Sequence, residues 1–123
     1  MAAKVADASV VGALIFQEPR AREAAGLLKG VDLCEPTILA YELASIARKK
    51  SVLYPGERDN LLHGLMLGLA LDIRWIEVDH PETVSLALET GLTTYDAAYL
   101  YVARLCGGTL VTFDERLRKA TTH

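Results

Sequence analysis

Four acidic side chains, in segments far apart along the chain, are the residues most able to carry chemistry. Asp7 and Asp114 each follow an apolar run predicted to be a strand and precede a segment predicted to be a helix. Glu42 and Asp96 lie within predicted helices, each one turn before an apolar residue that should face the core. Ligands of parallel α/β sheets bind at the carboxyl ends of the strands, so these carboxylates are expected to converge there.

Such convergence has an electrostatic cost, and that cost indicates the chemistry. Two like charges about 4 Å apart repel by about 4 kcal/mol at an effective dielectric near 20, a large share of a small domain's stability. Some of the acids must therefore take up protons, or a divalent cation must neutralise them. An all-oxygen carboxylate set suits Mg²⁺ or Mn²⁺. Such an ion lowers the pKa of bound water and stabilises charge on a phosphodiester.

Three of the acids have a purely structural alternative at the start of a helix. Asp7 and Asp114 are well placed to cap the helices that follow them. Asp96 lies three residues after Thr93 in the segment TTYD, which matches the capping-box pattern. Both interpretations of these residues remain open at the level of the sequence.

Two basic runs lie close to the acids along the chain. They comprise Arg48, Lys49 and Lys50 in the helix of Glu42, and Arg116, Arg118 and Lys119 after Asp114. Either run could guide phosphates toward the site, and solvated helix faces explain both equally well. An ion pair with Arg48 or Lys49 is also the structural alternative for Glu42. The net charge of −3 does not exclude a nucleic acid, because the chain has 16 acidic and 13 basic residues, and 16 − 4 = 12 acids remain without the four candidates.

Histidine and cysteine are not expected to take part in the chemistry. His63 and His80 lie in unrelated segments and His123 is the final residue, so none is assigned a catalytic role. Cys34 and Cys106 form no CxxC motif and are predicted to be packing residues. The absence of a His or Cys cluster argues against zinc.

Strands and helices that alternate along the chain must position these residues. Strands are predicted at residues 4–6, 32–36, 73–78 and 109–113, and helices at residues 7–16, 19–30, 37–50, 55–70, 80–91, 93–108 and 114–120. Thr37 is the predicted cap of the helix that carries Glu42. This alternation is typical of an α/β fold with a parallel sheet covered by helices on both faces.

Composition indicates one globular domain, residues 1–123. The chain is 51% hydrophobic and 24% charged, which argues against intrinsic disorder, and no repeat or linker interrupts it. The N-terminus does not resemble a signal peptide, so a cytoplasmic protein is expected. The most apolar run, residues 61–71, is about half the roughly 20 residues that a membrane helix needs, so no membrane span is predicted.

Four sequence blocks together resemble the PIN domain family. They are DASVV near the N-terminus, PTILAYELASI, GLTTYDAAYLYVA and LVTFD, and they span Asp7 to Asp114. The nearest resemblance is to the small single-domain toxins of VapC type. It implies a three-layer PIN-like fold with a central, mostly parallel sheet of about four to five strands flanked by helices. It also implies metal-dependent ribonuclease activity on RNA and acidic site residues at the positions of Asp7, Glu42, Asp96 and Asp114.

The resemblance further suggests that two hydroxyls support the carboxylates from behind. These are Ser9 in DAS and Thr112 in TFD. The alternatives are that Ser9 stabilises the first helical turn and that Thr112 is an ordinary strand residue. Many members of the family continue into a further strand after the last helix, and the short segment KATTH leaves that edge strand in doubt.

A toxin of this type implies partners as well as a substrate. The resemblance implies a cognate antitoxin protein that covers the acidic cleft, and self-association into a homodimer. The predicted helix over residues 61–71 is apolar on most sides, and Gly64 and Gly68 would allow another helix to approach closely. The alternative is that this helix packs only within the chain's own core.

A different class of function has the same fold. The chain could be a non-catalytic PIN-like scaffold that binds RNA or a protein partner, because a fold does not determine its function. A phosphoacceptor receiver domain is disfavoured, because Asp7 has no adjacent acidic partner. Binding of Mn²⁺ and its dependence on Glu42 would separate the nuclease from the scaffold.

Overall fold

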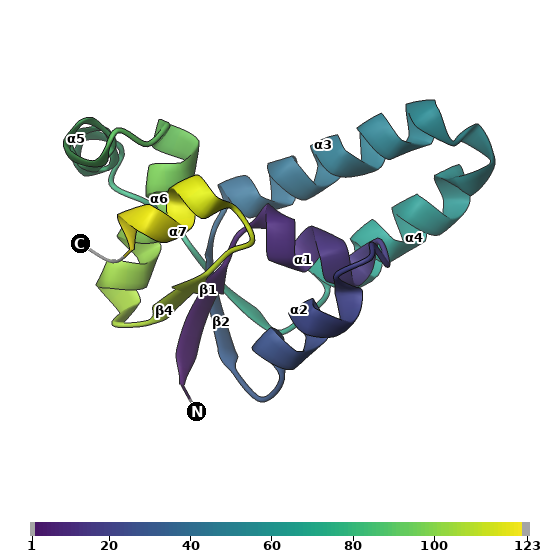
Figure 1. Ribbon diagram of the computed structural model, residues 1–123, viewed down its shortest axis with the longest axis horizontal. Helices are drawn as coiled ribbons and strands as arrows, with labels where there is room; N and C mark the ends of the chain where they lie inside the picture. Colours follow the sequence, from purple (N-terminus) through teal and green to yellow (C-terminus); the bar gives the residue numbers. More distant parts are fainter. Residues whose placement is uncertain (1, 122–123) are drawn as a thin grey trace.

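Four short apolar segments form the strands of one sheet in the computed structural model, which describes residues 2–121 (Figure 1). They are β1 (Ala3–Ala6), β2 (Asp32–Pro36), β3 (Ile73–Ile76) and β4 (Thr109–Val111). The strand order is β3-β2-β1-β4 and every pairing is parallel. The predicted α/β class is therefore confirmed, with four strands. Within residues 2–121, no strand follows the last helix.

Helices connect the strands at every step, as parallel pairing requires. In chain order they are α1 (Ala8–Ile15), α2 (Ala21–Leu28), α3 (Ile38–Leu53), the 3₁₀ helix η1 (Pro55–Glu57), α4 (Arg58–Leu69), α5 (His80–Thr90), α6 (Thr94–Cys106) and α7 (Glu115–Ala120). Helix α6 packs across β1, β2 and β4 on one face of the sheet, and α5 packs on α6. Helices α1 and α2 lie on the opposite side, which completes the three layers (Figure 1).

The strand order of the sheet reverses at β1. The chain runs from β1 outward to β2 and β3, and then returns to the other side of β1 as β4. Ligands of open α/β sheets bind where the strand order reverses, at the carboxyl ends of the strands. In this protein that position lies between the ends of β1 and β4; Asp7 directly follows β1, and Asp114 lies three residues after the last residue of β4.

The start of helix α3 differs from the prediction. Thr37 makes no side-chain capping hydrogen bond, so the predicted cap is wrong. Its backbone already has right-handed helical angles, φ −61° and ψ −21°, whereas a capping residue needs an extended backbone to turn its hydroxyl back to the helix. Thr93 does have an extended backbone, and its hydroxyl accepts a hydrogen bond from the Asp96 N–H at 3.1 Å.

Helices α3 and α4 form a hairpin that extends away from the sheet (Figure 1). The two glycines of α4 are used inside the chain: a Cβ on Gly64 would lie 2.6 Å from the Ile15 carbonyl oxygen, and one on Gly68 would lie 2.7 Å from the Ile15 Cδ1. Close approach to α1 is therefore what these glycines permit. The other side of α4 is not covered, and Met66 is 62% exposed.

Cys34 belongs to the main apolar core and Cys106 packs against it, as predicted. Both cysteines are free thiols; Cys34 is buried and Cys106 is half-buried. In the part of the chain that the structure describes, no helix is both long enough and apolar enough to cross a bilayer. His123 lies outside the described residues.

Candidate active site at the carboxyl ends of the strands

Asp7, directly after β1, is the most firmly held of the four acids. It is 7% exposed, and its Oδ1 accepts hydrogen bonds from the Ser9 hydroxyl at 2.6 Å and the Val10 N–H at 3.4 Å. Its Oδ2 accepts from the Thr112 hydroxyl at 2.6 Å. Burial raises the pKa of Asp7, and the hydrogen bonds oppose this effect. Asp7 therefore caps α1, as its structural alternative predicts. It also lies at the carboxyl end of β1, where ligands of parallel sheets bind.

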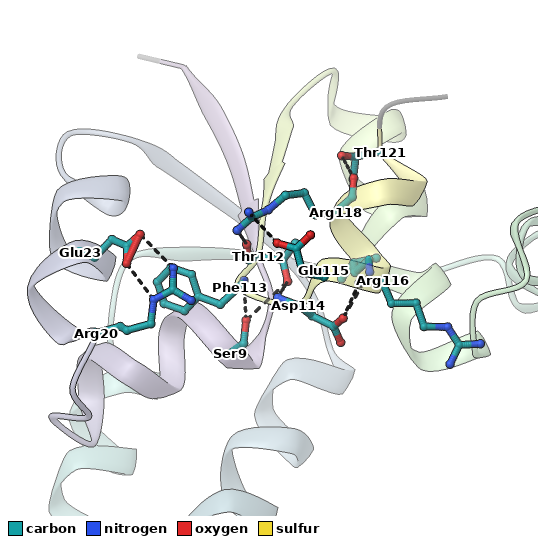
Figure 2. A network of polar contacts seen from close by, with 11 residues as sticks. Ser9, Arg20, Glu23, Thr112, Phe113, Asp114, Glu115, Arg116, Arg118 and Thr121 are labelled. Carbon is teal, nitrogen blue, oxygen red and sulfur yellow. Dashed lines mark hydrogen bonds and ion pairs between the residues drawn. The ribbon is translucent and has the colours of Figure 1, made fainter.

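The hydroxyls of Ser9, in the first turn of α1, and of Thr112, in the loop after β4, connect these two segments (Figure 2). Ser9 Oγ accepts a hydrogen bond from the Phe113 N–H at 2.9 Å, and Thr112 Oγ1 accepts one from the Asp114 N–H at 2.9 Å. Each hydroxyl thus donates to Asp7 and accepts from the loop after β4. The position of Asp7 relative to Asp114 is consequently determined by two side chains rather than by strand pairing alone.

Asp114 begins α7, as the capping alternative predicts. Its Oδ1 accepts hydrogen bonds from the Arg116 N–H at 2.8 Å and the Leu117 N–H at 3.4 Å (Figure 2). The Arg118 guanidinium donates to the Thr112 carbonyl at 3.0 Å and also pairs with Glu115. The basic run after Asp114 therefore helps to hold the loop after β4.

Glu42 enters the site from helix α3. It is half-buried, and the Tyr99 hydroxyl of α6 donates a hydrogen bond to its Oε1. Burial raises the pKa of Glu42, the Tyr99 hydrogen bond lowers it, and the charges of Asp96 and Asp7 raise it further. Among the described residues Glu42 forms no ion pair with Arg48 or Lys49, so the structural alternative for Glu42 is not what the fold shows.

Asp96 completes the set from the first turn of α6. Burial raises its pKa, and the charges of Asp114 and Asp7 raise it further. The charge of Asp7 thus contributes to the raised pKa of both Glu42 and Asp96, and the charge of Asp114 contributes to that of Asp96. These charge effects link the four carboxylates that were expected to converge, and we call Asp7, Glu42, Asp96 and Asp114 the acidic face.

The acidic face suits a divalent cation in chemistry and charge, but its side chains do not form a ready coordination set. Over residues 2–121, no group of three or more His, Cys, Asp or Glu side chains lies close enough to hold a metal ion. Asp7 has both oxygens occupied by hydroxyl donors, and Tyr99 holds Glu42. The donors are all carboxylate oxygens whose mutual repulsion a divalent cation would remove.

Glu35 is a buried acid that the sequence analysis did not single out. It is fully buried on β2; its Oε2 accepts a hydrogen bond from the Ala6 N–H at 3.0 Å, and its Oε1 has no partner. Backbone pairing of β1 with β2 ends at Lys4 and Leu33, so the Glu35 carboxyl group replaces a main-chain acceptor at the end of β1. Burial raises the pKa of Glu35 to about 9, so the group is neutral at pH 7. The available signal was a charged residue inside the apolar run LCEP.

Tyr99 is the second residue of the site that was missed. It is fully buried on α6, three residues after Asp96 and therefore on the same side of the helix. Burial and the nearby carboxyl group of Glu42 raise the pKa of Tyr99, so the hydroxyl stays protonated and acts as a donor to Glu42. Helical spacing from Asp96 was the signal that could have identified it.

The chain is similar over nearly its whole length to proteins of known family. The sequence model of the PIN domain matches residues 4–122. A curated protein of Pyrobaculum aerophilum named Ribonuclease VapC3 is 33% identical over 118 residues, which cover 92% of this chain and 90% of that protein.

Two solved structures share the fold. The crystal structure of PAE2754 from Pyrobaculum aerophilum has a TM-score of 0.78 and 27% identity, and the match covers 98% of this chain and 80% of that one. The crystal structure of VapBC2 from Rickettsia felis, bound to a DNA fragment from its promoter, has a TM-score of 0.67 and 16% identity. That match covers 96% of this chain and 92% of the other.

Proposed function

Because this chain belongs to the PIN domain family, we propose that it is a Mg²⁺- or Mn²⁺-dependent endoribonuclease made of one domain, the toxin of a type II toxin–antitoxin pair. The observation that carries the proposal is the position of Asp7 at the carboxyl end of β1, next to the point where the strand order reverses, with its carboxylate held by the Ser9 and Thr112 hydroxyls. The relative named Ribonuclease VapC3 supports RNA as the substrate.

Each acid has a distinct part in the proposed reaction. Asp7, oriented by Ser9 and Thr112, would be the fixed ligand, and Glu42 of α3 and Asp96 of α6 would provide the further carboxylate ligands. Asp114 completes the set directly or through water. The bound ion would supply an activated water and charge stabilisation on the phosphodiester. The protein's own contribution is to orient the oxygen ligands and to hold their hydrogen-bonding partners in place.

The basic residues divide into two groups with different expected roles. Lys50 pairs with Glu18 at 2.8 Å and Arg118 holds the loop after β4, so both are engaged in structure. Arg48 and Lys49 are exposed on α3, about two turns beyond Glu42. We expect these two residues to attract the phosphates of an RNA strand that runs along α3.

The α3–α4 hairpin is the surface on which we expect the proposed toxin to form a dimer. Its outer surface exposes several large apolar side chains: Val52, Leu53, Leu62, Met66 and Leu67. Exposed apolar side chains gathered on one element are typical of a protein interface. We propose that a second copy of the chain uses this surface and that an antitoxin covers the acidic face, with the protein acting in the cytoplasm. A monomer by light scattering at micromolar concentration would contradict the dimer, and a genomic neighbourhood without a small antitoxin frame would contradict the pair.

A non-catalytic scaffold is the second candidate. The observation in its favour is that no three potential ligands in residues 2–121 lie in metal-binding positions. Such a scaffold would bind Mn²⁺ weakly, and its affinity for RNA would not change when Glu42→Gln is introduced. A nuclease would lose Mn²⁺ affinity and cleavage in the same variant.

The decisive experiment is cleavage of a mixed-sequence RNA pool by the purified chain with Mn²⁺, with and without a chelator. We expect cleavage that stops on chelation and is lost in Asp7→Asn and Asp96→Asn. Asp59→Asn is the matched control, because Asp59 is an exposed acid of α4, in the hairpin away from the acidic face. No cleavage by the wild-type chain, or equal cleavage by Asp7→Asn, would refute the proposed activity.

A further inference from the structure

A groove with aromatic walls lies beside the acidic face. It encloses about 310 Å³ and is lined by Ile38 and Tyr41 of α3, Val84 of α5, and Tyr95 and Ala98 of α6, among others. We call it the tyrosine groove. A volume of this size is at the lower end of the range for sites that bind small molecules.

The tyrosine groove and the acidic face are built from the same two helices. Tyr41 directly precedes Glu42 on α3, and Tyr95 directly precedes Asp96 on α6. Consecutive helical residues project about 100° apart, so each helix presents an acid to one surface and a tyrosine to the adjoining one. A ligand that has its charged group at the acidic face can therefore reach the groove with a neighbouring group.

Both tyrosine rings are left open to solvent. Tyr41 is 75% exposed and Tyr95 is 60% exposed, although each lies on a helix whose opposite side is buried. Exposed rings offer flat apolar faces to a ligand at little cost in ordering, since each ring has two rotatable side-chain bonds. Packing of the chain itself does not account for two such rings at one groove.

The lining of the groove has the character expected for a base rather than for a phosphate. Among the described residues, no Asp, Glu, Lys or Arg lines it. Its polar side-chain groups are the hydroxyls of Thr37, Tyr41, Thr83, Thr94 and Tyr95 and the imidazole of His80. An apolar pocket with a small number of polar groups is typical of sites that take a flat, mostly uncharged ligand.

We propose that the tyrosine groove is a stacking subsite for one nucleobase of single-stranded RNA, next to the phosphodiester that is cleaved. This inference rests on the proposed ribonuclease function. A nucleotide matches the arrangement because its base and its phosphate are joined through a single sugar, so the phosphate at the acidic face places an adjacent base at the groove. Bases of single strands stack on aromatic side chains in many RNA-binding proteins, whereas paired bases are not available.

The first test separates stacking from folding. Tyr41→Ala and Tyr95→Ala are expected to raise KM for a short single-stranded RNA about 5- to 100-fold, the range for loss of one base–aromatic stack, with a smaller change in kcat. Tyr41→Phe and Tyr95→Phe keep the ring and should keep the wild-type KM. Tyr54→Ala is the control, because Tyr54 is also 60% exposed but lies at the far end of α3.

The second test identifies the ligand as a base. Once the cleaved bond is mapped, an RNA with an abasic residue beside that bond can be compared with the intact RNA. The KM of the wild-type chain for the abasic RNA should rise by the same factor as the KM of the Tyr→Ala variants for the intact RNA. In the Tyr→Ala variants the abasic residue should raise KM little further, because the same contact is already absent. Independent, multiplying losses would overturn the stacking subsite, and so would a wild-type KM in both Tyr→Ala variants, the result expected if the groove takes a protein segment instead.

The two proposals fail in different ways. If the wild-type chain cleaves RNA in a metal-dependent manner and the tyrosine variants match it, only the stacking subsite is wrong. If the wild-type chain cleaves no RNA, the ribonuclease proposal is wrong and the subsite is wrong with it.

Discussion

Asp7 and Glu42 contribute to the same acidic face, yet they are held in different ways. Asp7 follows the central strand, is nearly fully buried, and has both oxygens hydrogen-bonded to side-chain hydroxyls. Glu42 projects from a helix that continues into the exposed α3–α4 hairpin, and Tyr99 holds one of its oxygens. We call Asp7 with its two hydroxyl donors the strand side of the acidic face, and Glu42 with Asp96 the helix side. The strand side is preorganised, whereas the helix side keeps more freedom to adjust.

This difference has a physical origin. The hydroxyls that hold Asp7 come from Ser9 in the first turn of α1 and from Thr112 in the loop after β4. The Phe113 N–H donates to Ser9 Oγ and ties the two segments together, and the Asp114 N–H donates to Thr112 Oγ1 within the loop. Rotation of Asp7 would therefore leave buried donors unsatisfied, which is costly. Glu42 and Asp96 are only half-buried, and water can replace the contacts that they leave.

The largest expected effect is on the strand side. Asp7→Asn should reduce Mn²⁺-dependent RNA cleavage by at least about 100-fold, because a charged ligand fixed by the fold is lost. Glu42→Gln should cost less, since the helix side can readjust around the remaining acids. Single-turnover cleavage rates of the two variants test this order. A larger loss in Glu42→Gln would reverse the comparison between the two sides.

Removing the Thr112 hydroxyl that donates to Asp7 should have the next largest effect, a loss of Mn²⁺ affinity. Thr112→Val keeps the shape of the side chain but deprives Asp7 Oδ2 of its donor, and outer hydrogen bonds of this kind typically contribute 10- to 100-fold to metal affinity. Calorimetric titration with Mn²⁺ measures the change. Thr109→Val, at an exposed position of β4, the strand that precedes Thr112, is the control. An unchanged Mn²⁺ affinity in Thr112→Val would show that Asp7 needs no such support.

Glu35 offers a test of the strand side that does not depend on metal. Its pKa is about 9 in the folded chain against 4.5 for an ordinary glutamate, so between these values only the folded state holds the proton. The stabilising contribution of the protonated group is complete below pH 4.5 and is lost as the pH rises through about 9.

Glu35→Gln should therefore gain stability relative to the wild-type chain as the pH rises. We expect a relative gain of at least about 1 kcal/mol between pH 5 and pH 9. Urea unfolding of both chains at several pH values measures it. The same difference in unfolding free energy at both ends of the range would mean that Glu35 titrates normally in the fold.

The smallest expected effect is on the helix side. Tyr99→Phe removes the hydrogen bond that lowers the pKa of Glu42, so that pKa should rise further. Because a carboxylate must lose its proton to bind a metal, the pH midpoint of Mn²⁺ binding should move upward, with only a few-fold loss of affinity at high pH. Tyr101→Phe on the same helix is the control. A downward shift in Tyr99→Phe would show that the hydroxyl does not act through Glu42.

Much of the fold follows from patterns that extend over a few residues. Apolar runs identify the four strands, and helix-start residues such as Asp7, Thr93 and Asp114 cap as expected because capping depends on a local backbone turn. Thr37 is the exception, since its backbone continues the helix instead of preceding it. Placement of the acids at the ends of strands and on core-facing helix positions likewise follows from local periodicity.

The amino-acid sequence by itself determined the alternation of strands and helices and the candidate acids. Only the tertiary structure decided that β4 lies beside β1, which brings Thr112 within 2.6 Å of Asp7 across 105 positions of the chain. It also decided that the Glu35 carboxyl group accepts the hydrogen bond of the Ala6 N–H at the end of β1, and that Tyr99 rather than a neighbouring cation holds Glu42. Local patterns report burial and backbone preference, whereas these partners depend on strand order and helix packing, which no short stretch of sequence contains.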